Sequence, residues 1–383
     1  MKIISVVGAR PNFMKIAPLA HAIEQHNAST PGTFVEHKLV HTGQHYDVRM
    51  SEGFFRELNI PAPDINLEIG SGSHAEQVGR TMIAFEKVLL RERPDWVVVL
   101  GDVNATLACS VTAKKLCISV CHIEAGLRSG DMTMPEEINR LVTDRLSDLL
   151  LTPDTFSSLH LFREGVLPEK VRFVGNIMID TLEANREKAA AFDLDRILEE
   201  NSLLSDGTTN LPDLSGGFAL LTMHRPSNVD SVESLAPILD FLTDEATTTL
   251  PVVWPIHPRT RNMLLLFGLW DKVVACPGLV LLQPLGYHEM LRLNIEARLA
   301  LTDSGGLQEE CCVLGTPCLT LRWSTERPVT LQEHGGASVL VGNNVQRIRE
   351  EFRKTLGADR VPKRPELWDG HTADRCLAAL LEM

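Results

Sequence analysis

The stretch His122-Ile-Glu-Ala-Gly-Leu-Arg-Ser-Gly-Asp-Met-Thr-Met-Pro-Glu-Glu-Ile-Asn-Arg140 decides how the rest of the sequence is interpreted. Residues 116–123 are rich in apolar and β-branched side chains and predict a buried strand, so Glu124 should lie just past its carboxyl end. Pro135 then opens a predicted helix with two carboxylates in its first turn, near the positive end of the helix dipole. Because ligands of open α/β sheets bind outside the carboxyl ends of the strands, this charged loop is a candidate site, and a salt-bridged loop is the alternative.

The composition excludes several classes of protein. The chain of 383 residues is long enough for about two to three domains, and its formal net charge of -13 argues against a polyanion binder, so we expect no nucleic-acid partner. We expect no membrane partner either, because no apolar run approaches the roughly 20 residues that span a membrane. The eight cysteines lie mostly in apolar runs without a Cys-x-x-Cys pair, which favours a cytoplasmic protein without a metal site.

The first half begins like a doubly wound sheet. Residues 3–7 form a predicted strand that runs through a glycine turn into a helix, and this places Arg10 and Lys15 near a helix N-terminus, a setting that favours phosphate. The turn lacks the G-x-G-x-x-G spacing of a dinucleotide site, and a purely structural turn is the alternative. Asp102 follows the apolar run 95–100 and should lie at the carboxyl end of a strand, unless it is a helix N-cap.

The second half repeats the alternation of strands and helices, which predicts a parallel sheet with right-handed crossovers. Its predicted strands are residues 217–222, 251–256, 279–282, 299–302 and 318–321. A polar segment with glycine and proline at residues 198–213 indicates a domain boundary. The predicted fold class is therefore α/β, with two Rossmann-like, doubly wound domains facing each other across a cleft.

Basic and small residues gather at the predicted strand ends of the second half. They are His224, Arg225, His257, Ser304, Gly305, Gly306 and Arg327. Ser304 and its two glycines suit a phosphate cradle at a helix N-terminus, or an ordinary N-cap. Glu310, one turn into that helix, is near enough to accept a hydrogen bond from a ribose hydroxyl. The first half offers Asp102, Glu124 and Glu136 for acid–base work. Together these residues favour chemistry on a nucleoside-diphosphate sugar.

Motifs in one order from residue 8 to residue 328 connect these positions. They are Gly8-Ala-Arg-Pro, Gly43-Gln-His-Tyr, Gly101-Asp, His122-Ile-Glu-Ala-Gly-Leu-Arg, Pro135-Glu-Glu-Ile-Asn-Arg, Gly175-Asn, His224-Arg, Thr302-Asp-Ser-Gly-Gly-Leu-Gln-Glu-Glu and Thr325-Glu-Arg-Pro. In them the chain resembles the non-hydrolysing UDP-N-acetylglucosamine 2-epimerases. The resemblance implies a glycosyltransferase-B-like fold, with a catalytic domain at 1–195, a UDP-binding domain at 196–365 and a helix at 366–383 that returns to the first domain. It also implies a homodimer that needs no NAD or other cofactor.

The resemblance further implies a reaction and roles for these residues. UDP is eliminated to leave a 2-acetamidoglucal, and re-addition with a proton on the opposite face inverts C2. Asp102, Glu124 and Glu136 match the catalytic carboxylates, and His224 matches a catalytic histidine near the departing diphosphate. Arg10 and Ser304 should hold phosphate and Glu310 the ribose. The expected UDP site is completed by Lys15, Arg225, His257, Gly305, Gly306 and Arg327.

Departures from the family pattern leave the substrate open. Some members carry two more residues within the stretch that corresponds to 122–140 and use that region to bind a second, activating substrate molecule. Met132 replaces an arginine that is frequent in the shorter-loop branch, which includes enzymes for UDP-2,3-diacetamido-glucuronate. The sequence is also compatible with a hydrolysing relative, and with a silent sugar-nucleotide binder or a transferase on the same fold. A transferase would not require the acids of residues 124–136. A silent binder would be expected to lose one of Asp102, Glu124, Glu136 or His224, and the sequence keeps all four.

Glu136→Gln should abolish turnover while UDP affinity changes little. The substitution keeps the shape of the side chain but removes the group that exchanges a proton. Steady-state epimerisation and a calorimetric UDP titration measure the two quantities separately. Near-normal turnover of the variant would contradict the role assigned to Glu136.

Overall fold

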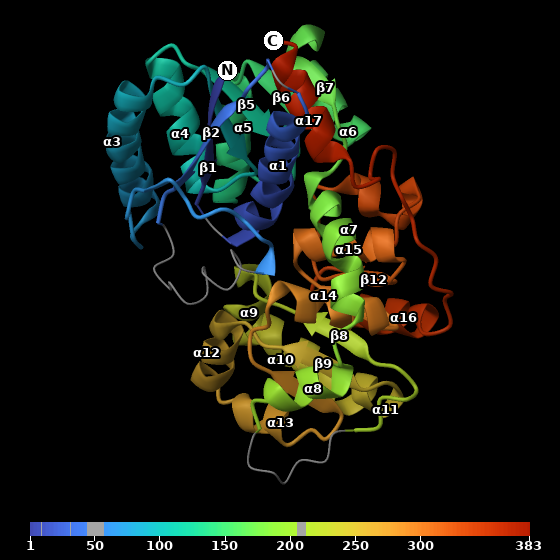
Figure 1. Cartoon of the computed structure of the whole chain (residues 1–383). Helices are drawn as coiled ribbons and strands as arrows, with labels where there is room; N and C mark the ends of the chain where they lie inside the picture. The colour runs from blue at the N-terminus through green and yellow to red at the C-terminus, as the bar shows by residue number, and fades with distance from the viewer. Residues whose placement is uncertain (9, 31, 44–56, 205–211) are drawn as a thin grey trace. The chain divides into compact units, whose positions relative to one another are not determined.

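The computed structural model describes residues 1–8, 10–30, 32–43, 57–204 and 212–383, so the helix expected over residues 50–58 lies almost entirely outside them. The chain divides into unit 1, which is Met1–Ala184 with Glu366–Met383, and unit 2, which is Asn185–Pro365 (Figure 1). The division lies inside helix α7 (Ile177–Ala190), ahead of the boundary that we expected between residues 195 and 196. The boundary differs from the expected one because α7 is a continuous helix whose first part belongs to unit 1 and whose last part belongs to unit 2.

Unit 1 contains a seven-stranded parallel sheet in the order β3-β2-β1-β4-β5-β6-β7. Its strands are β1 (Lys2–Val7), β2 (Glu36–His41), β3 (Ile65–Asn66), β4 (Trp96–Leu100), β5 (Ser119–Ile123), β6 (Leu149–Thr152) and β7 (Val171–Phe173). Its helices are α1 (Arg10–Ser29), α3 (His74–Glu92), α4 (Asn104–Lys115), α5 (Pro135–Leu146), α6 (Thr155–Arg163), the first part of α7, and α17 (Thr372–Leu381). The strand order reverses between β1 and β4, which makes this pair the switch point where doubly wound sheets bind ligands.

Unit 2 contains a six-stranded parallel sheet in the order β10-β9-β8-β11-β12-β13. Its strands are β8 (Ala219–Thr222), β9 (Val252–Pro255), β10 (Leu279–Leu282), β11 (Leu299–Thr302), β12 (Cys318–Thr320) and β13 (Ser338–Leu340). Its longer helices are α8 (Leu194–Glu200), α10 (Val232–Phe241), α12 (Pro258–Leu266), α14 (Tyr287–Glu296), α15 (Gly305–Leu314) and α16 (Val345–Thr355), with the short α9 (Pro226–Val229), α11 (Thr247–Thr249) and α13 (Trp270–Val274) between them. The switch point lies between β8 and β11. The prediction of two doubly wound α/β sheets is confirmed.

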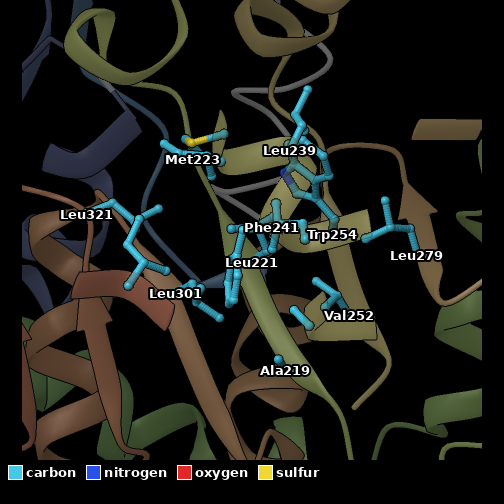
Figure 2. Close-up of a cluster of buried hydrophobic side chains, with 14 of the residues drawn as sticks. Ala219, Leu221, Met223, Leu239, Phe241, Val252, Trp254, Leu279, Leu301 and Leu321 are labelled. Carbon is cyan, nitrogen blue, oxygen red and sulfur yellow. The ribbon is translucent and has the colours of Figure 1, made fainter. Parts of the chain in front are cut away.

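Alternate side chains of the unit 2 strands enter two separate apolar cores. In the first core, Leu221 of β8 packs with Val252 and Trp254 of β9 (Figure 2), under α10 and α16. In the second core, Leu220 packs with Val253, under α8, α14 and α15. Burial on both faces explains why these strands are nearly continuous apolar runs in the sequence. Each fully buried aliphatic side chain contributes roughly 1.5–3 kcal/mol, so the cores hold the strand ends in place.

The C-terminal segment belongs to unit 1, where α17 lies beside α1 (Figure 1). The Asp180 carboxylate accepts hydrogen bonds from the backbone N–H groups of Thr372 and Ala373, at 3.0 and 2.6 Å, and so holds the N-terminus of α17. Burial raises the pKa of Asp180 although these N–H groups act in the opposite direction. The indole of Trp368, which is fully buried, donates to the carbonyl oxygen of Pro153 at 2.9 Å. The return of the chain is thus fixed by polar and apolar contacts within unit 1.

Gly175→Ala should lower the free energy of unfolding by at least about 3 kcal/mol, because Gly175 has a φ of +93° and an added Cβ would overlap the carbonyl of Leu367. Gly79→Ala is the matched control. Gly79 lies inside α3, where an added Cβ meets open space, so the change should raise stability by about 0.5–1 kcal/mol. Urea unfolding measures both variants, and equal effects would contradict the close approach at Gly175.

Candidate active site

A buried ion pair lies at the switch point of unit 1. The ammonium of Lys15, on α1, contacts the carboxylate of Glu124, which follows β5, and the two side chains are 7% and 4% exposed. Asn12 donates to the carbonyl of Leu100 at 2.8 Å and joins the same α1 turn to the end of β4. Glycine is favoured at position 101, because its φ is +63° and an added Cβ would lie 2.7 Å from the Lys15 nitrogen. Lys15, which we expected near a phosphate, is thus placed against a candidate catalytic carboxylate.

The backbone of Glu124 is strained. Its φ is +73°, in the left-handed region that non-glycine residues seldom adopt, and such a residue costs roughly 1–3 kcal/mol. Two hydrogen bonds stabilise this backbone conformation: the N–H groups of Glu124 and Ala125 both donate to the carbonyl of Leu151, each at 3.0 Å. Strain that the surroundings maintain at a strand end is a feature of functional sites. Sequence patterns could not predict it, because glutamate has no preference for this conformation.

Asp102 follows β4, which is the neighbour in the sheet of β5, the strand that Glu124 follows. Its carboxylate accepts a hydrogen bond from the guanidinium of Arg140 at 2.7 Å, and its side chain is 26% exposed. The carbonyl of Asp102 accepts from the Asn139 amide at 2.8 Å. Val103, not Asp102, occupies the N-cap position of α4. The interpretation of Asp102 as a helix cap is therefore wrong, and its carboxylate is left partly open at the strand end.

The two adjacent acids of α5 differ in their surroundings. Glu136 is exposed on the first turn, and no described contact joins it to Asp102 or Glu124. Glu137 is buried and accepts hydrogen bonds from the backbone of Ser129 and Gly130 and from Arg140. Burial alone would raise the pKa of Glu137, but these donors outweigh it and lower the pKa. Glu137 therefore shapes the charged loop, and Glu136 is the acid of this pair that solvent or a ligand reaches.

At the switch point of unit 2, the carboxylate of Asp303 holds the turn that carries His224. It accepts from the backbone N–H of His224 at 2.9 Å, from that of Arg225 at 2.8 Å and from the Asn228 amide at 3.0 Å. Burial acts to raise the pKa of Asp303, and the charge and hydrogen bonds of His224 lower it overall. Asp303 was not among the predicted site residues. Its signal in the sequence is an acid directly after a buried strand.

Two histidine rings lie together beside this turn. The ring of His224 is 40% exposed, and its Nδ1 is 3.1 Å from Asp303. The ring of His257, at the start of α12, has its centroid 5.2 Å from that of His224. Arg225 donates through Nε to the carbonyl of Asp303 at 3.0 Å, which orients its guanidinium along the same strand ends. The structure thus brings His224, Arg225 and His257 together, as the sequence predicted.

The Ser-Gly-Gly turn opens α15 at the end of β11. Ser304 occupies the N-cap position, but its hydroxyl makes no capping hydrogen bond within the part of the chain that the structure describes. Its backbone N–H donates to the Thr302 hydroxyl at 2.9 Å. Gly305 is packed so closely that an added Cβ would lie 2.6 Å from Arg327. Gly306 continues the first turn, where backbone N–H groups and the helix dipole favour an anion.

Arg327 lies in a buried cluster of charges behind this turn. Its guanidinium donates to Glu309 at 2.6 Å and contacts Glu326, which also accepts from Arg322 at 2.6 Å. Burial would raise the pKa of Glu326, but the two arginines hold it well below its usual range. The two arginines and two glutamates balance in charge. Arg327 is therefore paired with Glu309 and Glu326 beside Gly305, and its expected role in binding UDP stays a prediction.

Glu310 is buried on the first turns of α15. Burial raises its pKa to about 7, the charge of Glu309 acts in the same direction, and hydrogen bonding with Asn294 and Tyr287 opposes the shift. A buried carboxyl with such a pKa can accept or donate a hydrogen bond near neutral pH.

The side chain of Arg10, the remaining predicted residue, lies outside the part of the molecule that is described. Within that part, no group of three or more His, Cys, Asp or Glu residues is arranged to hold a metal ion, and no helix is long and apolar enough to cross a membrane.

These features together are typical of α/β enzymes that act on nucleotide-linked substrates: two doubly wound sheets, carboxylates at one switch point and an anion-binding turn at the other. The sequence matches the family model described as UDP-N-acetylglucosamine 2-epimerase over residues 28–381. The chain belongs to this family, and the resemblance drawn from its motifs is confirmed.

Relatives support this assignment along the whole chain. The chain is 40% identical over 381 residues to the UDP-N-acetylglucosamine 2-epimerase of Methanocaldococcus jannaschii, with 99% of each chain covered. It is also 40% identical over 362 residues to the UDP-2,3-diacetamido-2,3-dideoxy-D-glucuronate 2-epimerase of Pseudomonas aeruginosa, with 93% of each covered. The crystal structure of the Methanocaldococcus jannaschii UDP-GlcNAc 2-epimerase with UDP-GlcNAc and UDP has a TM-score of 0.88 to this chain at 39% identity, covering 100% of both.

Glu310→Gln should change how stability depends on pH. The folded pKa of about 7 lies above the ordinary value of 4.5, so the contribution of Glu310 to stability is fully present below pH 4.5 and is lost as the pH rises through 7. The free energy of unfolding of the wild type should therefore fall relative to Glu310→Gln over this range, by up to about 3 kcal/mol. Urea unfolding between pH 4.5 and 8 measures the difference.

Glu350→Gln, on the exposed face of α16, is the matched control and should follow the wild type at every pH. A difference between wild type and Glu310→Gln that stays constant from pH 4.5 to 8 would contradict the buried carboxyl at position 310.

Proposed function

We propose that this chain is a UDP-N-acetylglucosamine 2-epimerase that interconverts UDP-N-acetylglucosamine and UDP-N-acetylmannosamine without hydrolysis. The observation that carries the proposal is the arrangement at the switch point of unit 1. There Asp102 and Glu124 follow adjacent strands β4 and β5, and Lys15 keeps one of these acids paired with a cation. A transferase or a simple binder has no need of this arrangement. Membership of the family along nearly the whole chain supports the same conclusion.

In the proposed reaction the sugar loses a proton at C2 and UDP at C1, and it then gains a proton at C2 and UDP at C1 again. A carboxylate among Asp102, Glu124 and Glu136 accepts the C2 proton, and the C1–O bond breaks with its electrons passing to UDP. The 2-acetamidoglucal that remains receives a proton on the opposite face of C2, and UDP re-forms the bond at C1. Two acids in different surroundings suit this exchange, because one must accept a proton where another donates. Glu124 is buried beside Lys15, whereas Asp102 is partly exposed beside Arg140.

Unit 2 supplies the groups for the nucleotide. The backbone N–H groups of Gly305 and Gly306 lie in the first turn of α15, and together with Arg225 they suit the diphosphate as charge develops on it. His224, whose ring is next to that of His257, is the proposed catalytic histidine at the departing diphosphate. Glu310 is the proposed partner of a ribose hydroxyl. Each of these roles accords with the local geometry of unit 2.

We further propose a cytoplasmic homodimer that needs no NAD or other cofactor. A related substrate, UDP-2,3-diacetamido-2,3-dideoxy-D-glucuronate, is the second candidate, because the Pseudomonas aeruginosa enzyme that its name assigns to this sugar is as similar in identity as the Methanocaldococcus jannaschii enzyme. The two candidates share the proposed chemistry at C2 and differ only in the sugar.

Proton NMR of the purified protein with UDP-N-acetylglucosamine in deuterated water tests the proposal. We expect deuterium at C2 together with the signal of intact UDP-N-acetylmannosamine, because the proton that returns comes from an acid in exchange with solvent. Free UDP with free N-acetylmannosamine would contradict the non-hydrolysing reaction. An unchanged spectrum, followed by turnover of the diacetamido uronic acid substrate, would transfer the assignment to the second candidate.

A further inference from the structure

A fully buried histidine, His122, lies beneath the strand ends of unit 1 and is not used in the proposed reaction. Its Nε2 is 2.8 Å from the carbonyl oxygen of Gly101, and its Nδ1 is 2.6 Å from a carboxylate oxygen of Asp144. The carbonyl oxygen and the carboxylate oxygen are both hydrogen-bond acceptors, so each ring nitrogen faces an acceptor. His122 therefore joins the peptide that precedes Asp102 to a carboxylate on α5.

The second oxygen of Asp144 reaches the other turn of the candidate site. It accepts from the backbone N–H of Gly126 at 3.1 Å and contacts the guanidinium of Arg128 at 2.7 Å. Burial would raise the pKa of Asp144, but His122 and Arg128 outweigh it and lower the pKa, so the group is a carboxylate. One buried carboxylate thus connects the turn after β4, through His122, with the turn after β5.

These two turns carry Asp102 and Glu124, and both adopt backbone conformations that need support. Gly101, Glu124 and Gly126 have φ values of +63°, +73° and +82°. A Cβ on Gly126 would overlap the carbonyl of Ser157, so this turn fits the fold only with glycine at that position. Charge-assisted hydrogen bonds in a buried site are strong and directional, and they hold such turns in one arrangement.

We propose that His122 and Asp144 are positioning residues that fix the two catalytic turns of unit 1 relative to each other. Neither residue contacts the substrate in this proposal. They act through the Gly101 and Gly126 backbone groups on the placement of Asp102 and Glu124. The inference rests on the proposed function, since it gives these two acids their catalytic roles. Displacing a catalytic group by about 1 Å can lower a rate by about 100-fold, so loss of either residue should appear mainly in kcat.

The chain offers a matched control beside the same strand. Asp148 follows α5, accepts from the backbone N–H of Val120 at 2.9 Å and pairs with Lys114 at 2.8 Å. It therefore resembles Asp144 in chemistry, but it lies at the start of β5, away from the strand end that carries Glu124. The Asp144 side chain is 1% exposed and that of Asp148 is 29% exposed, so Asp144→Ala should lose more stability in any case. A purely structural role for Asp144 would leave the kcat of folded Asp144→Ala equal to that of Asp148→Ala.

The experiment measures kcat, KM and the calorimetric UDP dissociation constant for Asp144→Ala, His122→Phe and Asp148→Ala, below the unfolding temperature of each. We expect Asp144→Ala and His122→Phe to lower kcat by about 10- to 100-fold, with UDP affinity within about twofold of wild type. Asp148→Ala should keep the wild-type kcat even where its thermal stability falls.

Asp144→Asn is a conservative variant that should restore the lost activity. It also tests the proposal if Asp144→Ala does not fold. The amide oxygen can still accept from Gly126 and Arg128, the amide N–H₂ can donate to Nδ1 of His122, and Nε2–H of His122 can keep its bond to Gly101. Most of the lost kcat should return. Equal kcat in Asp144→Ala and Asp148→Ala, or no recovery in Asp144→Asn, would overturn the positioning role. Inactivity of the wild type would instead overturn the proposed function.

Discussion

A buried carboxylate that accepts hydrogen bonds from the backbone of a strand-end turn is the interaction on which both units depend. In unit 2, Asp303 holds the backbone of His224 and Arg225. In unit 1, Asp144 holds Gly126 directly and Gly101 through His122. Turns at the carboxyl ends of parallel strands have backbone groups that the sheet no longer pairs, and buried groups of this kind need partners. A carboxylate accepts several of them at once, so it fixes a turn without closing the strand end to a ligand.

The two units use charge differently at their strand ends. In unit 1 the cation Lys15 pairs with the buried Glu124, and the cation Arg140 pairs with the partly exposed Asp102. In unit 2 the charges behind the Ser304 turn balance among themselves. An anion there is attracted by the helix N-terminus and by nearby basic groups rather than by net charge, which accords with the formal net charge of -13 for the chain. This difference suits acid–base chemistry in one unit and nucleotide binding in the other.

The sequence predicted both sheets because burial on two faces leaves continuous apolar runs, and it predicted the strand-end residues because they follow those runs directly. It did not predict β3 or β13, which are too short to show a period. The sequence also could not predict hydrogen bonds and ion pairs between side chains that are far apart in the chain. Asp144 is a polar residue on a helix in the sequence, and only the fold brings it to His122. The ion pair between Arg327 and Glu309 is likewise visible only in the fold.

The central claim is that unit 1 carries the catalytic acids and unit 2 binds the nucleotide. The most direct test is the UDP dissociation constant, measured by calorimetry for Arg225→Gln, Glu124→Gln and the wild type. Loss of a charge-assisted hydrogen bond to phosphate should weaken UDP binding by about 10-fold or more in Arg225→Gln. Glu124→Gln removes an acid–base group and the negative charge that pairs with Lys15, both in unit 1, and should bind UDP within about twofold of wild type while its turnover is lost. Equal weakening of UDP binding by the two substitutions would contradict the assignment of catalysis to unit 1 and nucleotide binding to unit 2.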